Sequence, residues 1–174
     1  MKKEIIITGY GGQGIMQAGN ILIKAAILED KVTTFFPSYG AEMRGGAANC
    51  KVIISDEFIG SPIVYKPDYV LCFSRLAFEK FRKSLKPDGL MFLNSDLVKI
   101  ENNIDVLVLE ANTLSEKFGS KIMANMAMLG LFIARVKLLK QASMEEAIKE
   151  SFKHKGEKIV NLNIEVFRAG LDCV

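Results

Sequence analysis

The sequence predicts an α/β fold: a three-layer, mostly parallel, open sheet of the Rossmann-like type, with helices on both faces and a helical C-terminal portion. Three observations predict it. Strand-like and helix-like segments alternate along the first part of the 174 residues. The strand-like segments are continuous apolar runs, as in strands buried on both faces. A glycine-rich turn joins the first strand to the first helix.

The first strand, turn and helix follow one another without a break. Glu4 to Thr8 is an apolar, β-branched run, and the turn "GYGGQG" of residues 9–14 comes directly after it. Ile15 to Leu28 then carries apolar residues at helical spacing. This is the order of elements that a nucleotide-binding turn requires.

The second strand is predicted over Val32 to Phe36, with Pro37 ending it. The segment "PSYGAEMRGG" of residues 37–46 shows neither the helical nor the strand periodicity of apolar residues and is rich in glycine, which predicts a loop. Ala48 to Ser55 resumes as a strand, and Phe58 to Val64 is predicted to be a short partner strand.

The remaining elements continue the alternation. In order, they are a strand over Asp68 to Ser74, a helix over Arg75 to Leu85, and strands over Leu90 to Asn94 and Asp105 to Glu110. From about Leu114 the chain is predicted to be helical, with Ser143 to Glu146 as a capping box. No linker or repeat divides it, so we expect one domain over residues 1–174.

Composition excludes several classes of function. The 23 Lys and Arg and 20 Asp and Glu are spread along the chain, which argues against nucleic acid as a partner. The longest apolar tract, Ile122 to Ala134, is too short to span a bilayer, which needs about 20 residues. The basic stretch from Lys153 to Lys155, which holds the only histidine, is predicted to be solvated surface. We therefore expect neither a membrane segment nor a histidine-based catalytic site.

The three cysteines lie far apart, at Cys50, Cys72 and Cys173, and form no C-x-x-C pair. Neither an iron–sulfur cluster nor a zinc site can be built from such a set alone. The chain runs from Met-Lys-Lys straight into a strand, which leaves no room for a signal peptide. Together these features predict a cytoplasmic protein.

The glycine turn has the G-x-G-x-x-G spacing of a dinucleotide-binding turn, through Gly9, Gly11 and Gly14. Its amide N–H groups lie at a helix N-terminus, which favours an anion or a partner's backbone. The alternative is a tight turn that only packs the helix against the strand. The P-loop is excluded, because Gln13 replaces its lysine and no Gly-Lys-Ser or Gly-Lys-Thr follows.

A nicotinamide or flavin fingerprint also needs an acid at the end of the second strand. That place holds Phe35-Phe36-Pro37-Ser38, while Asp30 precedes the strand and Glu42 lies beyond it. Arg44, which would suit NADP, is displaced as well. The dinucleotide interpretation is therefore disfavoured but stays open. Gln13 suits a polar ligand or a partner's backbone, or is an exposed turn residue.

The second loop combines an aromatic hydroxyl, an acid and a guanidinium, at Tyr39, Glu42 and Arg44, with Gly40, Gly45 and Gly46. Arg44 can bind a phosphate or carboxylate bidentately, while Glu42 can hold Arg44 or pair across an interface. The alternative is a local Glu42–Arg44 contact without a ligand. Because this loop follows the second strand, we expect it to lie beside the glycine turn.

The late segment "KIMANMAMLGLFIARVKLL" is apolar nearly all round, with Asn125 and Arg135 as its only polar residues between Lys121 and Lys137. A helix of this character is buried on most sides. The sequence leaves open how much of that surface is core and how much is a subunit interface.

Four segments together resemble the gamma subunit of the 2-oxoacid:ferredoxin oxidoreductases: "GYGGQG", "PSYGAEMRGG", "IGSPIV" and "NMAMLG". Their order and spacing resemble that subunit along nearly the whole sequence. The resemblance implies a subunit of a complex that oxidatively decarboxylates a 2-oxoacid, transfers the acyl group to coenzyme A and reduces ferredoxin. It also favours 2-oxoglutarate as the substrate, with branched-chain oxoacids and pyruvate behind it.

The resemblance further implies that thiamine diphosphate, its Mg²⁺ and the iron–sulfur clusters belong to partner subunits. These partners would be alpha, beta and ferredoxin-like delta chains. The isolated chain would be inactive, and we expect no catalytic residue and no metal ligand in it. The residues expected to contact partner subunits or coenzyme A are Gly9, Gly11, Gly12, Gln13, Gly14, Tyr39, Gly40, Glu42, Arg44, Gly45 and Gly46.

Two alternatives remain. One is a free-standing oxidoreductase domain that binds NAD(P) or a flavin on the same fold. The other is the corresponding subunit of an indolepyruvate oxidoreductase, which resembles this chain in both loops but is usually somewhat longer.

Overall fold

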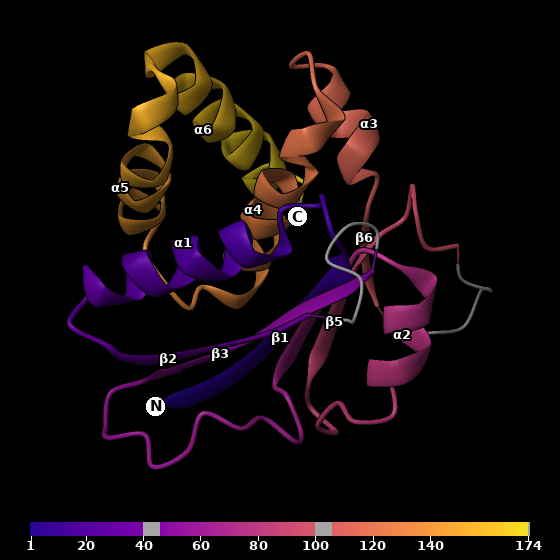
Figure 1. Cartoon of the computed structure of the whole chain (residues 1–174), viewed down its shortest axis with the longest axis vertical. Coiled ribbons are helices and arrows are strands. Elements are labelled where there is room, and N and C mark those ends of the chain that lie inside the picture. The colour runs from indigo at the N-terminus through magenta and orange to yellow at the C-terminus, as the bar shows by residue number, and fades with distance from the viewer. Residues whose placement is uncertain (40–45, 100–105, 174) are drawn as a thin grey trace.

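A computed structural model describes residues 1–39, 46–99 and 106–173. Six strands form one sheet in the order β2-β3-β1-β4-β5-β6 (Figure 1). Their bounds are β1 (Lys2–Tyr10), β2 (Val32–Tyr39), β3 (Ala47–Ser55), β4 (Tyr69–Cys72), β5 (Leu90–Asn94) and β6 (Leu107–Leu109). Only β3 runs against the others, since it is antiparallel to both β1 and β2. The predicted open, mostly parallel sheet is confirmed.

Helices cover the two faces of the sheet unequally. They are α1 (Ile15–Ile27), α2 (Arg75–Phe81), α3 (Ala111–Glu116), α4 (Ala124–Val136), α5 (Gln141–Phe152) and α6 (Glu157–Leu171), with 3₁₀ turns η1 (Lys121–Met123) and η2 (Lys153–Lys155). Figure 1 shows α1, α4, α5 and α6 on one side of the sheet, here called the first face. On the second face lie α2 and the coil of residues 56–68.

Two hydrophobic cores follow from the alternation of side chains along the strands. Ile5 and Ile7 of β1 are fully buried in the first-face core, which contains most of the helical residues. Ile6, between them, is buried in the smaller second-face core with Ile53 and Phe78. The continuous apolar run of the first strand is thus buried on both sides, as predicted.

Two predictions around the second and third strands are wrong. Pro37 does not end β2, which continues to Tyr39 and pairs Pro37 with Cys50. β2 is an edge strand, and such a strand tolerates proline because one of its sides needs no hydrogen-bond donors. Residues 58–64 form coil instead of a strand. Ile59 and Val64 of this coil are buried in the second-face core, whereas Phe58 is 90% exposed.

The predicted capping box at Ser143 is also wrong. α5 begins at Gln141, so Ser143 lies inside the helix, and Lys140 is its N-cap residue. The backbone N–H of Lys140 donates to Glu29 Oε1 at 2.7 Å. A carboxylate that follows α1 therefore satisfies this end of α5, a contact between positions 111 residues apart.

α4 packs against α6 through glycines. A Cβ atom added at Gly130 would lie 2.8 Å from Gly170 C, and one added at Gly170 would lie 2.9 Å from Ala127 C. The two backbones therefore approach too closely for any side chain. Residues 124–133 are all buried. Most of the apolar surface of the late helix is therefore part of the chain's own core, which answers the question that the sequence left open.

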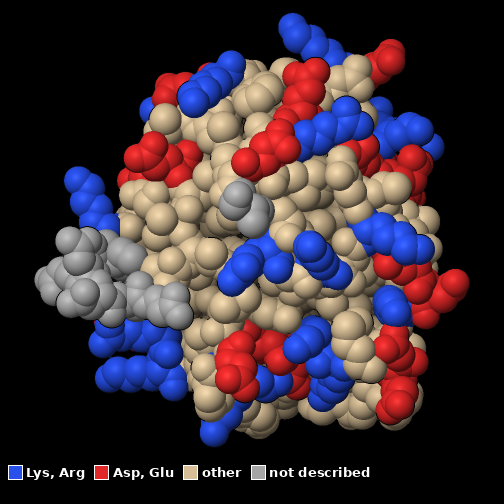
Figure 2. All heavy atoms as spheres, turned by 180° about the vertical axis from the view of Figure 1, so that it is seen from behind, with Lys and Arg blue, Asp and Glu red and all other residues tan. Residues whose placement is uncertain are grey.

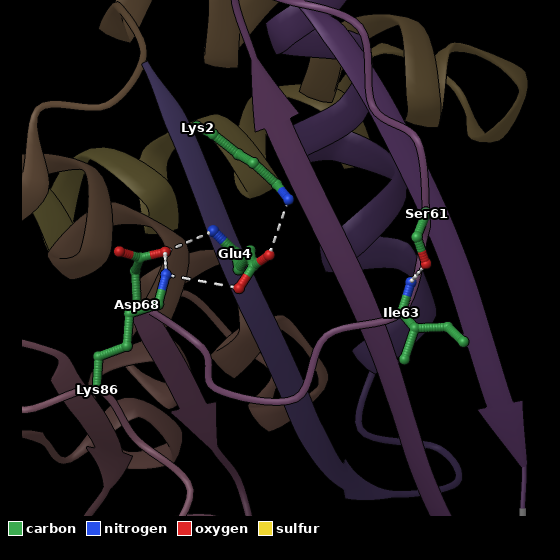
Figure 3. Close-up of polar contacts among 6 residues, drawn as sticks. All are labelled: Lys2, Glu4, Ser61, Ile63, Asp68 and Lys86. Carbon is green, nitrogen blue, oxygen red and sulfur yellow. Dashed lines mark hydrogen bonds and ion pairs between the residues drawn. The ribbon is translucent and has the colours of Figure 1, made fainter.

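An ionic cluster lies at the edge of the sheet where β1 and β4 begin (Figure 3). Asp68 Oδ2 accepts hydrogen bonds from the Glu4 backbone N–H at 2.9 Å and from Lys86 Nζ at 2.8 Å. Partial burial raises the pKa of Asp68, but these bonds, together with the charges of Lys86 and Lys3, outweigh it and leave that pKa below its ordinary value. The cluster joins the first strand to the start of β4.

The surface carries no segregated charge in the view of Figure 2, where acidic and basic side chains are interspersed. Among the described residues, no helix has the length and apolarity that crossing a bilayer requires.

Candidate functional site

The glycine turn lies at the edge of the sheet where β1 ends and α1 begins. Gly12 and Gly14 have φ of 94° and 71°, values that L side chains rarely adopt. Gly14 is the N-cap residue of α1. A Cβ atom at Gly9 would lie 2.8 Å from Phe73 Cβ, so the turn needs glycine there for close packing and at the other two positions for backbone geometry.

The Gln13 side chain is bonded within the chain. Its Oε1 accepts from the Tyr10 backbone N–H at 2.7 Å, and its Nε2 donates to the Phe73 carbonyl at 3.2 Å. The amide thus braces the turn against the residue that follows β4. Contact of Gln13 with a ligand or a partner stays a prediction, and its place in the turn now has a structural reason as well.

The two loops meet at the residues that the structure describes. Gly11 N–H donates to the Gly46 carbonyl at 3.0 Å, which links the turn to the residue just before β3. Tyr39 is the last residue of β2 and pairs with Ala48. Gly40, Glu42, Arg44 and Gly45 lie outside the described residues, so their expected roles stay predictions.

A cleft of about 550 Å³ opens beside the turn, here called the glycine-turn cleft. The N-terminal ends of three helices line it, through Gly14 and Gln17 at α1, Asn125 at α4, and Lys158 and Ile159 at α6. Helix N-termini carry partial positive charge. The lining also includes Lys155 but no acidic side chain among the described residues. The cleft is therefore electropositive, with apolar walls.

Asn125, the polar residue at the start of the late apolar helix, binds the glycine turn. It is only 4% exposed, and its Nδ2 donates to the Gly14 carbonyl at 3.1 Å. The sequence shows this residue as an isolated polar position, but nothing in it indicates the partner 111 residues away. Lys155 is exposed, as predicted for the basic stretch from Lys153 to Lys155. Its Nζ lies 5.6 Å from the centre of the Phe152 ring at the wall of the cleft, a position that the sequence does not indicate.

The cysteines do not fit a metal cluster. Cys50 is buried in the first-face core and Cys72 in the second-face core, so the sheet separates the two thiols. Burial raises the pKa of both thiols to about 12. Thiolates are the form that binds metals, and these two stay protonated at neutral pH. Among residues 1–39, 46–99 and 106–173, no group of three His, Cys, Asp or Glu is placed to hold a metal ion.

Comparison with known proteins gives the family. The model of the family described as pyruvate ferredoxin/flavodoxin oxidoreductase matches residues 4–173. The chain is 40% identical to 2-oxoglutarate synthase subunit KorC of Methanocaldococcus jannaschii over 157 residues, which cover 87% of this chain and 84% of that protein. It is 34% identical to ketoisovalerate oxidoreductase subunit VorA of Methanothermobacter marburgensis, of which the match covers only 36%.

A solved structure agrees along the whole length. The keto/oxoacid ferredoxin oxidoreductase gamma subunit from Geobacter sulfurreducens superimposes with a TM-score of 0.85 at 31% identity, covering 99% of this chain and 95% of that one. The resemblance expected from the four sequence segments is confirmed, and the chain belongs to the pyruvate ferredoxin/flavodoxin oxidoreductase family.

Proposed function

We propose that the chain is the gamma subunit of a 2-oxoglutarate:ferredoxin oxidoreductase. The complex converts a 2-oxoacid, coenzyme A and oxidised ferredoxin into acyl-CoA, CO₂ and reduced ferredoxin. The observation that carries the choice of substrate is the 40% identity to a 2-oxoglutarate synthase subunit over most of both chains. Relatives named for ketoisovalerate and pyruvate are also similar, so the substrate needs a direct test.

In this proposal the cofactors reside on partner subunits. The thiols of Cys50 and Cys72 are protonated, buried and on opposite faces of the sheet, which does not suit an iron–sulfur cluster. Thiamine diphosphate, Mg²⁺ and the clusters are then supplied by alpha, beta and delta chains in the cytoplasm, and the isolated gamma chain has no turnover.

The primary role is docking through the edge of the sheet that carries the glycine turn. Tyr10, Leu97 and Ile122 are exposed apolar side chains around that edge, and Ile122 is 77% exposed. Such side chains suit a protein contact better than water. In the same surface, the second loop with Glu42 and Arg44 would meet the thiamine-bearing subunits.

A second role is contact with coenzyme A, and the glycine-turn cleft favours it. Three helix N-termini and two lysines without a lining acid attract phosphate groups, and the apolar walls accept an uncharged part of the same ligand. Arg44 would add a bidentate phosphate contact from the neighbouring loop.

Co-purification from the native host, followed by assays with 2-oxoglutarate, 2-oxoisovalerate and pyruvate, tests the proposed function. We expect the highest kcat/KM with 2-oxoglutarate and no activity of the chain alone. Flavin absorbance in the purified chain, or thermal stabilisation by NAD or NADP, would instead support the free-standing oxidoreductase. Activity of the complex with indolepyruvate alone would support the other alternative.

Two substitutions separate the roles. In the reconstituted complex, Arg44→Ala with unchanged assembly and a raised KM for coenzyme A indicates the ligand role, whereas loss of co-purification indicates docking. Lys158→Ala tests the glycine-turn cleft with the same two measurements, the KM for coenzyme A and co-purification with the partner subunits. Lys149→Ala, on the outer side of α5, is its matched control.

A further inference from the structure

In the part of the chain that the structure describes, helices cover only part of the second face of the sheet. α2 spans only Arg75–Phe81 and packs with β4 and β5. Over β1, β3 and β2, the described residues provide no helix on this face, only the coil of residues 56–68. The reason is topological: β3 follows β2 in the chain and pairs with it antiparallel, whereas a parallel pair would have needed a crossover, usually helical.

Apolar side chains gather on this uncovered area. Of the fourteen large apolar side chains that are exposed in the described residues, half belong to this face: Tyr10, Val32, Phe36, Phe58, Ile63, Tyr65 and Leu76. The pairing register assigns the strand members to this face. Ser55 and Lys51 of β3 lie two residues from Ile53, so their side chains are on the second face with it. Val32 and Phe36 of β2 pair with these two residues and therefore lie on the same face. Figure 3 shows Ile63 in the coil that crosses in front of the strands.

The coil residues among them are held in place from beneath. Val64 is 3% exposed and packs in the second-face core, whereas its neighbours Ile63 and Tyr65 are 44% and 78% exposed. Ile63 N–H also donates to Ser61 Oγ at 3.2 Å. These apolar side chains therefore stand on an anchored segment.

Positive charge lies next to the apolar side chains. Lys80 lines a shallow groove with Tyr10, Asn49 and Leu76, and the groove has no acidic lining residue among those described. Lys51 pairs with Ile6 on one side and Phe36 on the other, in the middle of the same area. Within residues 1–39, 46–99 and 106–173, neither lysine takes part in an ion pair.

We infer that this second-face patch, formed by Tyr10, Phe36, Lys51, Leu76 and Lys80 with the coil residues Phe58, Ile63 and Tyr65, docks an amphipathic, acidic helix of a partner subunit. The inference rests on the proposed function. Such a helix completes the missing outer layer of the sheet. Its apolar stripe covers the exposed side chains, and its carboxylates meet Lys51 and Lys80. The patch meets the edge that carries the glycine turn at Tyr10 and extends from there over the second face, so the contact with the complex continues from that edge onto the second face.

The test uses the reconstituted complex, with a tag on a partner subunit. Lys51→Glu/Lys80→Glu should lower the gamma chain retained by at least about tenfold, since two favourable contacts become repulsive. Lys51→Arg/Lys80→Arg should retain it. The matched control is Lys149→Glu/Lys153→Glu, which makes the same charge change near the end of α5 and should stay within about twofold of wild type.

The apolar part is tested by Leu76→Asp and Phe58→Asp, with Ile27→Asp at the exposed end of α1 as control. Thermal melting of each isolated variant checks that it folds. Carbodiimide cross-linking of the wild-type complex should join Lys51 or Lys80 to partner carboxylates. Normal retention of the charge-reversed and apolar variants, without such cross-links, overturns the inference and leaves the proposed function standing.

The experiments also detect a different occupant of the second-face patch. If the isolated chain sediments as a dimer and Leu76→Asp makes it monomeric, a second copy covers the patch and the inference is wrong. If the wild-type chain itself fails to co-purify with any thiamine-bearing subunit, the proposed function fails and the inference fails with it.

Discussion

Single residues in the glycine turn act chiefly on backbone shape. Gly12 and Gly14 both have positive φ, but their surroundings differ. No heavy atom outside the immediate chain lies within 4 Å of a Cβ placed at Gly12, whereas a Cβ at Gly14 would collide with the Asn125 amide. Glycine is thus needed at Gly12 for the backbone conformation alone, and at Gly14 both for the backbone conformation and for the space that Asn125 occupies.

Gly14→Ala should therefore destabilise the protein more than Gly12→Ala. Positive φ costs a non-glycine residue about 1–3 kcal/mol, and at Gly14 the methyl group also displaces the donor to the Gly14 carbonyl. Urea unfolding of both variants measures the difference. Equal losses would mean that Asn125 moves aside freely.

Gln13→Glu should lower the free energy of unfolding by about 1–3 kcal/mol, although the shape of the side chain is kept. The carboxylate can still accept from Tyr10 N–H, but it cannot donate to the Phe73 carbonyl, which is left facing a negative charge. Unfolding in urea at pH 7 checks this. A variant as stable as wild type would show that the Phe73 contact contributes nothing.

Asp68 should make stability depend on acid pH. Its pKa is lowered in the folded chain, so its contribution is present above the unfolded pKa of about 4 and is lost as the pH falls through the folded value. Asp68→Asn should flatten the fall in unfolding free energy between about pH 5 and 2. Asp88→Asn, in an exposed turn, is the control and should follow the wild-type curve.

At the scale of elements, contacts between distant segments decide the features that local sequence rules missed. Ser143 to Glu146 has the pattern of a capping box, yet α5 begins earlier because Lys140 N–H finds the Glu29 carboxylate. Pro37 signals an end, yet the pairing of β2 with β3 continues past it. In both cases a tertiary contact overrides a correct local preference.

The capping contact can be tested directly. Glu29→Ala should destabilise the chain by about 0.5–2 kcal/mol, the range for losing an N-terminal cap. Ser143→Ala should change stability by less than about 0.5 kcal/mol, as expected away from such features. Thermal or urea unfolding distinguishes the two, and the opposite order would restore the capping box.

The contact between α4 and α6 should be intolerant of any side chain. Gly130→Ala and Gly170→Ala each place a methyl group against backbone atoms of the other helix, and overpacking costs about 1–3 kcal/mol or more. Gly60→Ala, where a Cβ meets nothing within 4 Å, is the control. Calorimetry should show lower Tm for the two helix variants only.

At the scale of the whole molecule, sequence predicted the sheet, the helical C-terminal part and the neighbourhood of the two glycine-rich loops. Periodicity and turn residues carry that information locally. It did not predict the antiparallel place of β3, because a strand's direction depends on its partners. It also missed the glycine-turn cleft, since Asn125 and Lys158 are brought to Gly14 only by the packing of α4 and α6.

The free edge of β2 has a further consequence for how copies of this chain behave when crowded. An exposed edge strand is a template on which another chain can add a strand and begin aggregation. Pro37 supplies no N–H group and so interrupts the row of donors along β2. The proline that leaves the fold intact thereby protects against uncontrolled sheet extension, and faces and loops remain as the routes of ordered assembly.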